Sequence, residues 1–218
     1  MARVSHKKVR QLLDEKRSKI TDRQFFTSRI LAGHFEDIAA AQTRRYKYNR
    51  RVHVYLYWDH NDPNVACTDN TVIKINCGNK VVTKIRGRLN RYKIISGLFA
   101  HELGHVLYTD FLAKQTYLRY LEHEKWFPGP PNLKTTQDAR NELDFWSYSK
   151  AEPRNLQMIQ YIASFIANVL EDGYVEARVL NQFTGVLGCS LEEMRQAQYE
   201  DMPTVEELIE KEDNGECH

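Results

Sequence analysis

The sequence lacks long hydrophobic runs, an apolar leader and a dense cysteine pattern. No apolar run approaches the roughly eighteen residues of a membrane-spanning helix, so we expect no membrane segment. The first residues, MARVSHKKVRQLLDEKR, become charged at once, which argues against a secretory signal. The 4 cysteines contain no C-x-x-C pair. Reduced thiols are expected, with Cys67–Cys77 as the one pair worth testing across a hairpin, and these absences together favour a cytoplasmic protein.

Charge is distributed unevenly along the 218 residues, which are enough to bury a sizeable core. Residues 1–100 carry 21 Lys and Arg against 8 Asp and Glu, whereas residues 101–218 carry 10 against 21. The basic stretch RRYKYNRR, residues 44–51, is of a kind that meets nucleic acid or an acidic partner, but no nucleic-acid motif accompanies it. We therefore expect the two halves to neutralise each other or to face solvent, without a nucleic-acid partner.

Periodicity predicts helices first, then two strands, then further helices. In "RVHVYLYW" apolar residues alternate with polar or aromatic ones, which is typical of a half-buried strand, and "NTVIKIN" predicts a second strand. The motif TDRQ reads as a capping box that opens a helix. The expected helices are 5–20, 21–41, about 91–111, 112–126 and a long one from about 152, with strands at 52–58 and 70–76. The fold class is α+β, mainly helical with a small sheet or hairpin.

The stretch SGLFAHELGHVLYTDF, residues 96–111, places two histidines and a glutamate within an apolar helix. His101 and His105 are four residues apart, so they lie on one face and can direct two ring nitrogens at one zinc ion. Glu102 lies beside them at another helical angle, where it can reach a water on the metal. This is the H-E-x-x-H arrangement, in which the glutamate is the general base of a zinc hydrolase. The alternative to a metal site is that the two histidines are core residues whose ring nitrogens are hydrogen-bonded to backbone carbonyls or to a carboxylate.

A catalytic zinc site needs a third protein ligand. A metzincin would have glycine at position 108 and histidine at 111, where this chain has Tyr108 and Phe111. A carboxylate from a later helix is the remaining common solution, and the motif NVLEDGYVEAR, residues 168–178, supplies it. We favour Glu171 as the third ligand, with Asp172 and Glu176 as alternatives. A further role open to Asp172 is to accept a hydrogen bond from a ligand imidazole and so orient it.

HELGH followed by a distant NVLED resembles the gluzincin pattern, of which thermolysin is an example. Here Asn168 stands three residues before Glu171, and Val175 four after it, where thermolysin-like enzymes place asparagine immediately before the glutamate and aspartate four after. The closer resemblance, over about residues 52–179, is to metallopeptidase domains found upstream of von Willebrand factor A modules and beside AAA+ ATPases. The resemblance implies a zincin-like fold, with the sheet packed on the H-E-x-x-H helix and on a second metal-ligand helix.

This reading divides the chain into N-terminal helices (1–45), a zincin-like metallopeptidase domain (46–185) and an acidic tail or linker (186–218). The expected function is zinc-dependent peptide hydrolysis, with Glu102 as general base and Tyr108 or Tyr174 as donor to the oxyanion. His123 is a weaker donor candidate. An extended peptide or protein substrate would add along Thr71–Asn76. The alternative is a non-catalytic, zinc-stabilised scaffold that serves an AAA+ ATPase or von Willebrand factor A-type partner.

Overall fold

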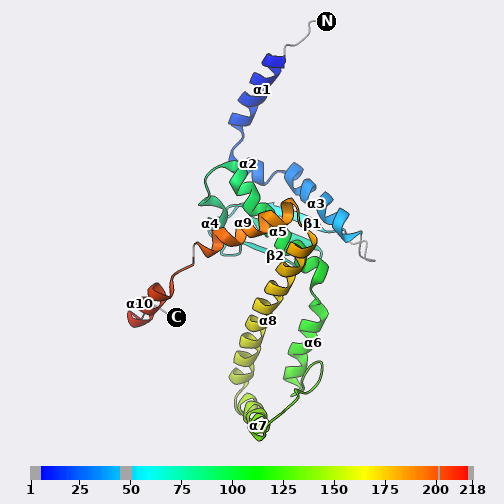
Figure 1. Ribbon diagram of the computed structural model, residues 1–218, viewed down its shortest axis with the longest axis vertical. Helices are drawn as coiled ribbons and strands as arrows, with labels where there is room; N and C mark the ends of the chain where they lie inside the picture. The colour runs from blue at the N-terminus through cyan, green and yellow to red at the C-terminus, as the bar shows by residue number, and fades with distance from the viewer. Residues whose placement is uncertain (1–5, 45–50, 201, 216–218) are drawn as a thin grey trace. The chain divides into compact units, whose positions relative to one another are not determined.

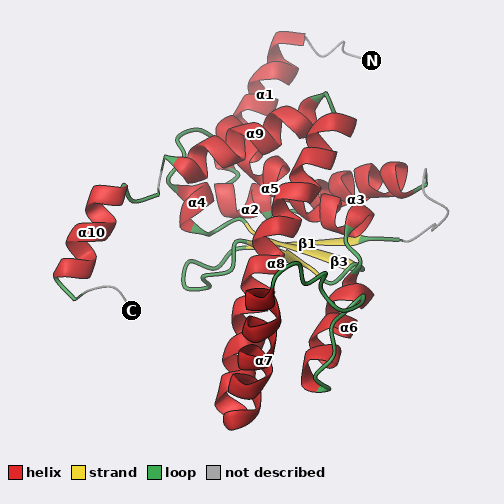
Figure 2. Ribbon diagram, turned by 60° about the horizontal axis from the view of Figure 1, so that its bottom comes forward, coloured by secondary structure: helices red, strands yellow, loops and turns green. Residues whose placement is uncertain are grey.

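The computed structural model describes residues 6–44, 51–200 and 202–215. The chain belongs to the α+β class, mainly helical with one small mixed sheet (Figures 1 and 2). It divides into a first unit, residues 1–107 with 178–218, and a second unit, residues 108–177. Within the described residues, no helix combines the length and the apolar character that crossing a bilayer requires.

The N-terminal region forms three helices rather than the two predicted. The expected capping box is confirmed: the Thr21 hydroxyl accepts from the Gln24 amide at 3.2 Å, and the Gln24 side chain accepts from the Thr21 amide at 3.0 Å. The single helix over 21–41 is wrong, because Ser28 caps a new helix by accepting from the Leu31 amide at 3.3 Å. The three helices are α1 (His6–Lys19), α2 (Asp22–Phe26) and α3 (Arg29–Thr43).

The sheet has three strands, β1 (His53–Tyr57), β2 (Ala66–Thr68) and β3 (Val72–Asn76), in the order β1-β3-β2. Both predicted strands are present, but they pair in parallel, so they do not form a hairpin. The hairpin is made by β2, which was not predicted, and β3. β3 is therefore central, and the expected substrate edge at Thr71–Asn76 is wrong because both sides of that strand are already paired. Cys67 and Cys77 are free thiols.

One face of the sheet supplies the core of the first unit. Val54, Leu56, Ile73 and Ile75 are buried, as the alternation in the sequence predicts. Helix α5 (Arg88–Tyr108) adds a buried row of apolar residues, and its Phe99 stacks on Phe35 of α3 with ring centroids 4.6 Å apart. Because burying a large apolar side chain contributes about 1.5–3 kcal/mol, this row holds α5 firmly in place.

The outer edge of β1 is covered by α3. The Val54 amide donates to Glu36 Oε1 at 3.1 Å, and Glu36 also accepts two hydrogen bonds from Arg29. Burial raises the pKa of Glu36, but the hydrogen bonds from Val54 and Arg29 outweigh it, so the pKa lies below its ordinary value. Glu36 is thus a carboxylate that seals this edge.

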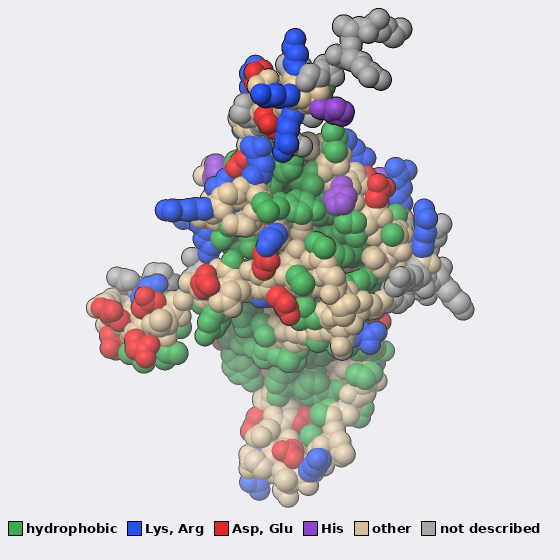
Figure 3. Space-filling view, turned by 45° about the horizontal axis from the view of Figure 1, so that its top comes forward, with side chains coloured by type: hydrophobic (Ala, Val, Ile, Leu, Met, Phe, Trp, Pro, Cys, Tyr) green, Lys and Arg blue, Asp and Glu red, His purple; other side chains and the backbone are tan. Residues whose placement is uncertain are grey.

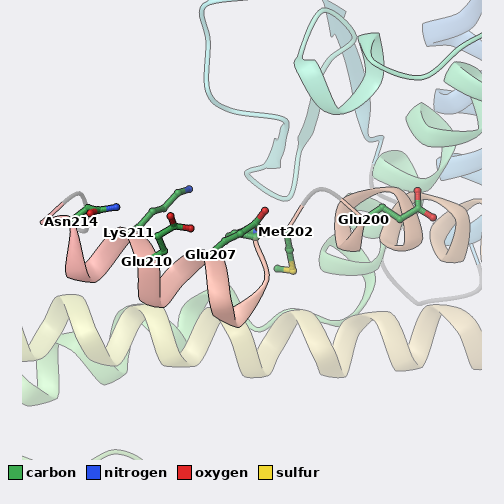
Figure 4. Close-up of a pocket in the computed structure, with 7 residues that line it drawn as sticks. Glu200, Met202, Glu207, Glu210, Lys211 and Asn214 are labelled. Atoms are coloured by element: carbon green, nitrogen blue, oxygen red, sulfur yellow. The ribbon is translucent and has the colours of Figure 1, made fainter.

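The segment expected to be a tail, residues 186–218, contains two different helices. Helix α9 (Val186–Tyr199) belongs to the core, with Leu191 and Met194 buried. Helix α10 (Val205–Asp213) buries no residue, and its side chains Glu207, Glu210 and Lys211 line a shallow polar hollow (Figure 4). Of the two helices, α10 is therefore the one that resembles a tail. Helix α9 is part of the first unit, as is the short helix α4 (Lys80–Thr83).

The two oppositely charged halves of the chain meet in places. Lys93 of α5 pairs with Glu193 of α9 at 2.8 Å, as expected if the halves neutralise each other. Lys and Arg are prominent in the upper part of Figure 3, and Asp and Glu gather on α10 at its left. Most of the basic stretch 44–51 lies outside the described residues.

The second unit contains α6 (Phe111–Glu122), α7 (Thr136–Ala151) and the N-terminal part of α8 (Pro153–Gln182). The long helix from about 152 is confirmed, and α7 was not predicted. α6 runs antiparallel to α8: Lys114 donates to Asn168, and Gln160 donates to Glu122 at 3.2 Å. Two hydrogen bonds at opposite ends therefore tie these helices together.

Candidate metal centre

Helix α5 brings His101 and His105 together on one face near its C-terminal end. Their Nε2 atoms lie 3.2 Å apart, with ring centroids separated by 4.7 Å and planes at 82°. Two nitrogens bound tetrahedrally to zinc at 2.0–2.1 Å would lie about 3.3 Å apart. The separation therefore fits two ligands of one ion without rearrangement. Both side chains are half-buried, so one side of the pair is open to solvent.

The turn before the histidines is rigid for a local reason. Ile95, Leu98 and Phe99 are buried, and Gly97 lets the backbone of α9 approach α5 closely at Ser190. A helix held on two sides fixes the direction of the side chains that follow it. The periodicity of the sequence predicts that the apolar residues of this helix are buried. The contact with α9 is visible only in the tertiary structure.

Glu102 is buried, with 6% of its surface exposed. It lies about 100° round the helix from His101 and about 60° from His105, so it stands to one side of the line that the two histidines form. Partial burial and then the negative charge of Glu102 raise the pKa of the Cys67 thiol on β2. Glu102 is therefore close enough to β2 for its negative charge to affect the Cys67 thiol.

One group among the described residues has the composition of a metal site: His101, His105 and Asp172, with ligand atoms within 4.8 Å of one another. Two imidazoles and a carboxylate are donors that zinc accepts. Glu171, which the sequence favoured, is not in this group, and neither is Glu176. Glu171 stays a prediction as a ligand, while the geometry favours its neighbour.

Helical spacing explains why Asp172 differs from Glu171. Val179, which is fully buried, follows Asp172 by about two turns, so the two residues share one face of α8. Glu171 lies about 100° round the helix from Asp172. This spacing is visible in the sequence, whereas the match to the motif NVLED points to Glu171.

The predicted oxyanion donors lie on two helices. Tyr108 is the half-buried last residue of α5, and Tyr174 is a largely exposed residue of α8. His123 is an exposed residue that caps the C-terminus of α6. Their assignment as donors stays a prediction.

Comparison with known proteins gives no relative from which a function can be transferred. No protein-family model matches the chain. No curated protein sequence and no solved structure matches it either. The chemistry of the site is therefore argued from its own residues.

Proposed function

We propose that the chain is a zinc-dependent peptidase in which His101, His105 and Asp172 hold the metal. The observation that carries this proposal is the 3.2 Å separation of the histidine Nε2 atoms, with the Asp172 carboxylate in the same group of ligand atoms. A zincin-like fold is part of the same proposal. The resemblance of HELGH and NVLED to metallopeptidase domains agrees with it.

The residues suit hydrolysis better than a purely structural site. Three protein ligands leave a fourth position for water, whereas structural zinc sites are usually closed by four. The histidines are only partly buried, so solvent and substrate can reach that position. Zinc bound there would lower the pKa of a coordinated water and polarise a carbonyl group.

Glu102 would act as the general base. Its carboxylate oxygen would take a proton from the attacking water and later deliver that proton to the leaving amine. Its position one residue after His101, at a different helical angle, keeps it near the metal ligands without making it one. Tyr108 and Tyr174 are the side chains that would donate to the developing oxyanion.

An extended peptide would pair with β2, replacing the edge expected at Thr71–Asn76. β2 is an outer strand, and the charge of Glu102 acts on Cys67 in the middle of it. Main-chain hydrogen bonds to such a strand give affinity without requiring a particular side chain. The proposed substrate class is therefore an unfolded or extended segment of a protein.

The test combines metal analysis with a cleavage screen on purified full-length chain. Glu102→Gln is expected to retain one zinc per chain and to lose all cleavage of a denatured-proteome substrate mixture. Glu206→Gln, on the exposed face of α10, is the matched control and should cleave like wild type. Absence of zinc from the wild type, or equal cleavage by Glu102→Gln, would refute the proposal.

The scaffold alternative makes opposite predictions. If zinc were structural, Glu102→Gln would leave partner binding and stability intact, and His101→Ala would unfold the first unit. Circular dichroism of His101→Ala therefore separates the two functions. A catalytic site predicts that this variant stays folded because the core of the first unit does not depend on the metal.

A further inference from the structure

Helix α8 carries a row of exposed apolar side chains on the face that also holds Asp172. Met158, Tyr161 and Phe165 precede Asp172 by fourteen, eleven and seven residues, so all three lie within about 40° of it around the helix. Met158 is half-exposed, Phe165 is 61% exposed and Tyr161 is 75% exposed. These three residues form the apolar row of α8, and the row points along the helix to a proposed metal ligand.

A different face of α8 belongs to the packing of the second unit. Ile162, Ile166 and Leu170 of α8 line an apolar groove of about 500 Å³ together with Tyr117 of α6 and Phe145 of α7. The three residues of the apolar row are not part of this lining. The neighbouring helices therefore do not account for the row, and exposed apolar patches of this kind mark interaction sites.

Charge narrows the kind of partner that the apolar row fits. No Asp, Glu, Lys or Arg interrupts the sequence between Arg154 and Glu171, so the row has no charged neighbour along the helix. The second unit, residues 108–177, carries 7 Lys and Arg against 10 Asp and Glu. This excess of negative charge disfavours an anionic membrane surface, which attracts helices rich in Lys and Arg. An uncharged, apolar polypeptide suits both observations.

We propose that the apolar row of α8 binds apolar side chains of the polypeptide substrate. The inference rests on the proposed function, because Asp172 is a ligand in that proposal and a chain that lies along the row leads to it. β2 would pair with the main chain of the substrate, whereas the row would select its side chains. The substrate class thereby narrows from any extended segment to an unfolded segment rich in apolar residues.

Helix and strand geometry predict which substrate residues the row contacts. A rise of 1.5 Å per residue places Phe165 about 10 Å and Tyr161 about 16 Å from Asp172 along α8. An extended chain advances about 3.3 Å per residue, so these distances correspond to about three and five residues from the scissile bond. Residues three and five lie on the same side of an extended chain. Both can therefore face the helix at once.

The first test measures binding without cleavage, on zinc-loaded full-length chain that carries Glu102→Gln. The probes are two short fluorescein-labelled peptides, one alternating leucine with serine and the other alternating glutamate with serine. The leucine peptide should bind at least about tenfold more tightly than the glutamate peptide, and adding Phe165→Glu should weaken it at least about tenfold. Ile30→Glu, on a residue of α3 that is 87% exposed, is the matched control and should leave binding unchanged. Circular dichroism and zinc content confirm that each variant is folded and loaded.

The second test maps the cleavage sites of the wild type in a denatured proteome by mass spectrometry. Apolar residues should be enriched at the third and fifth positions on one side of the cleaved bond. Phe165→Glu should lose the enrichment at the third position and keep its zinc. A wild type that binds the leucine peptide but cleaves nothing would refute the peptidase and support the row as a polypeptide-binding site.

Three results would overturn the inference. The first is equal binding of the leucine and glutamate peptides, and the second is equal binding by the Phe165→Glu and Ile30→Glu variants. The third is a row that serves another partner: self-association in sedimentation, or binding to anionic phospholipid vesicles, that Phe165→Glu abolishes while peptide binding is unchanged.

Discussion

Gly97 of α5 and Ser190 of α9 are in direct contact, because a Cβ atom built on Gly97 would overlap the Ser190 carbonyl oxygen. The Cβ atom of Met194 closes the same space. This crossing lies one turn before His101, so it positions the metal-binding end of α5. Glycine here serves packing between two helices and not a turn.

Gly97→Ala is expected to lower the free energy of unfolding by about 1–3 kcal/mol, because α9 must move away from α5. This loss exceeds the gain of about 1 kcal/mol that alanine brings to a helix interior. Urea unfolding measures the change. Gly33→Ala in α3 is the matched control, since nothing lies within 4 Å of its added Cβ, and it should be neutral or stabilising. Equal stability of the two variants would contradict the close crossing.

The third metal ligand can be identified by comparing two neighbouring carboxylates. Asp172→Asn is expected to weaken zinc binding at least about tenfold, because it removes a charged ligand from the group with His101 and His105. Glu171→Gln should bind zinc like wild type. Zinc content and competition with a chromophoric chelator measure both variants without reference to activity. The reverse result would return the ligand role to Glu171.

Asn76 holds the turn after β1 and is fully buried. Its Oδ1 accepts from the amides of Asp59 and Gly78 at 3.0 Å, and its Nδ2 donates to the Asp59 carbonyl at 2.7 Å. Asn76→Ala should therefore lower the free energy of unfolding by about 2–3 kcal/mol, since buried polar groups lose their partners. Asn64→Ala, on an exposed side chain in the same loop, should change it by less than about 0.5 kcal/mol. Thermal unfolding distinguishes the two.

Asp69 in the β2–β3 turn gives a pH-dependent contribution to stability. Hydrogen bonds from the Thr71 side chain and from the amides of Val72 and Thr71 lower its pKa from 3.8 to about 2. A lowered folded-state pKa means that the stabilisation is complete above pH 3.8 and is lost as the pH falls towards 2. The stability difference between wild type and Asp69→Ala should therefore be constant from pH 7 to about 5 and shrink below pH 4. A difference that stays constant down to pH 3 would contradict this role.

Local sequence signals predicted elements well where spacing was regular. The alternation in "RVHVYLYW", the capping box at Thr21 and the long helix α8 all follow from periodicity or from one short motif. The histidine pair on α5 follows from their four-residue spacing. These features depend on neighbours in sequence, so the sequence alone is enough to find them.

Other features depend on contacts between distant residues. β2 has only three residues, which is too short a pattern for periodicity to detect. Its pairing with β3 holds it in the sheet. α9 looked like a tail because its segment is rich in charged and polar residues, yet its few apolar side chains meet α5. The motif NVLED favours Glu171, whereas the buried side of α8 at Val179 is shared by Asp172.

Glu36 binds the outer edge of β1, so the sheet can be extended from one side alone. Two molecules could join their sheets once, through β2, and the joined edges would then be used up. A third molecule would find no open strand at which to continue. Sheet-to-sheet growth into fibres is therefore blocked at β1 by helix α3, whose Glu36 carboxylate already binds the Val54 amide.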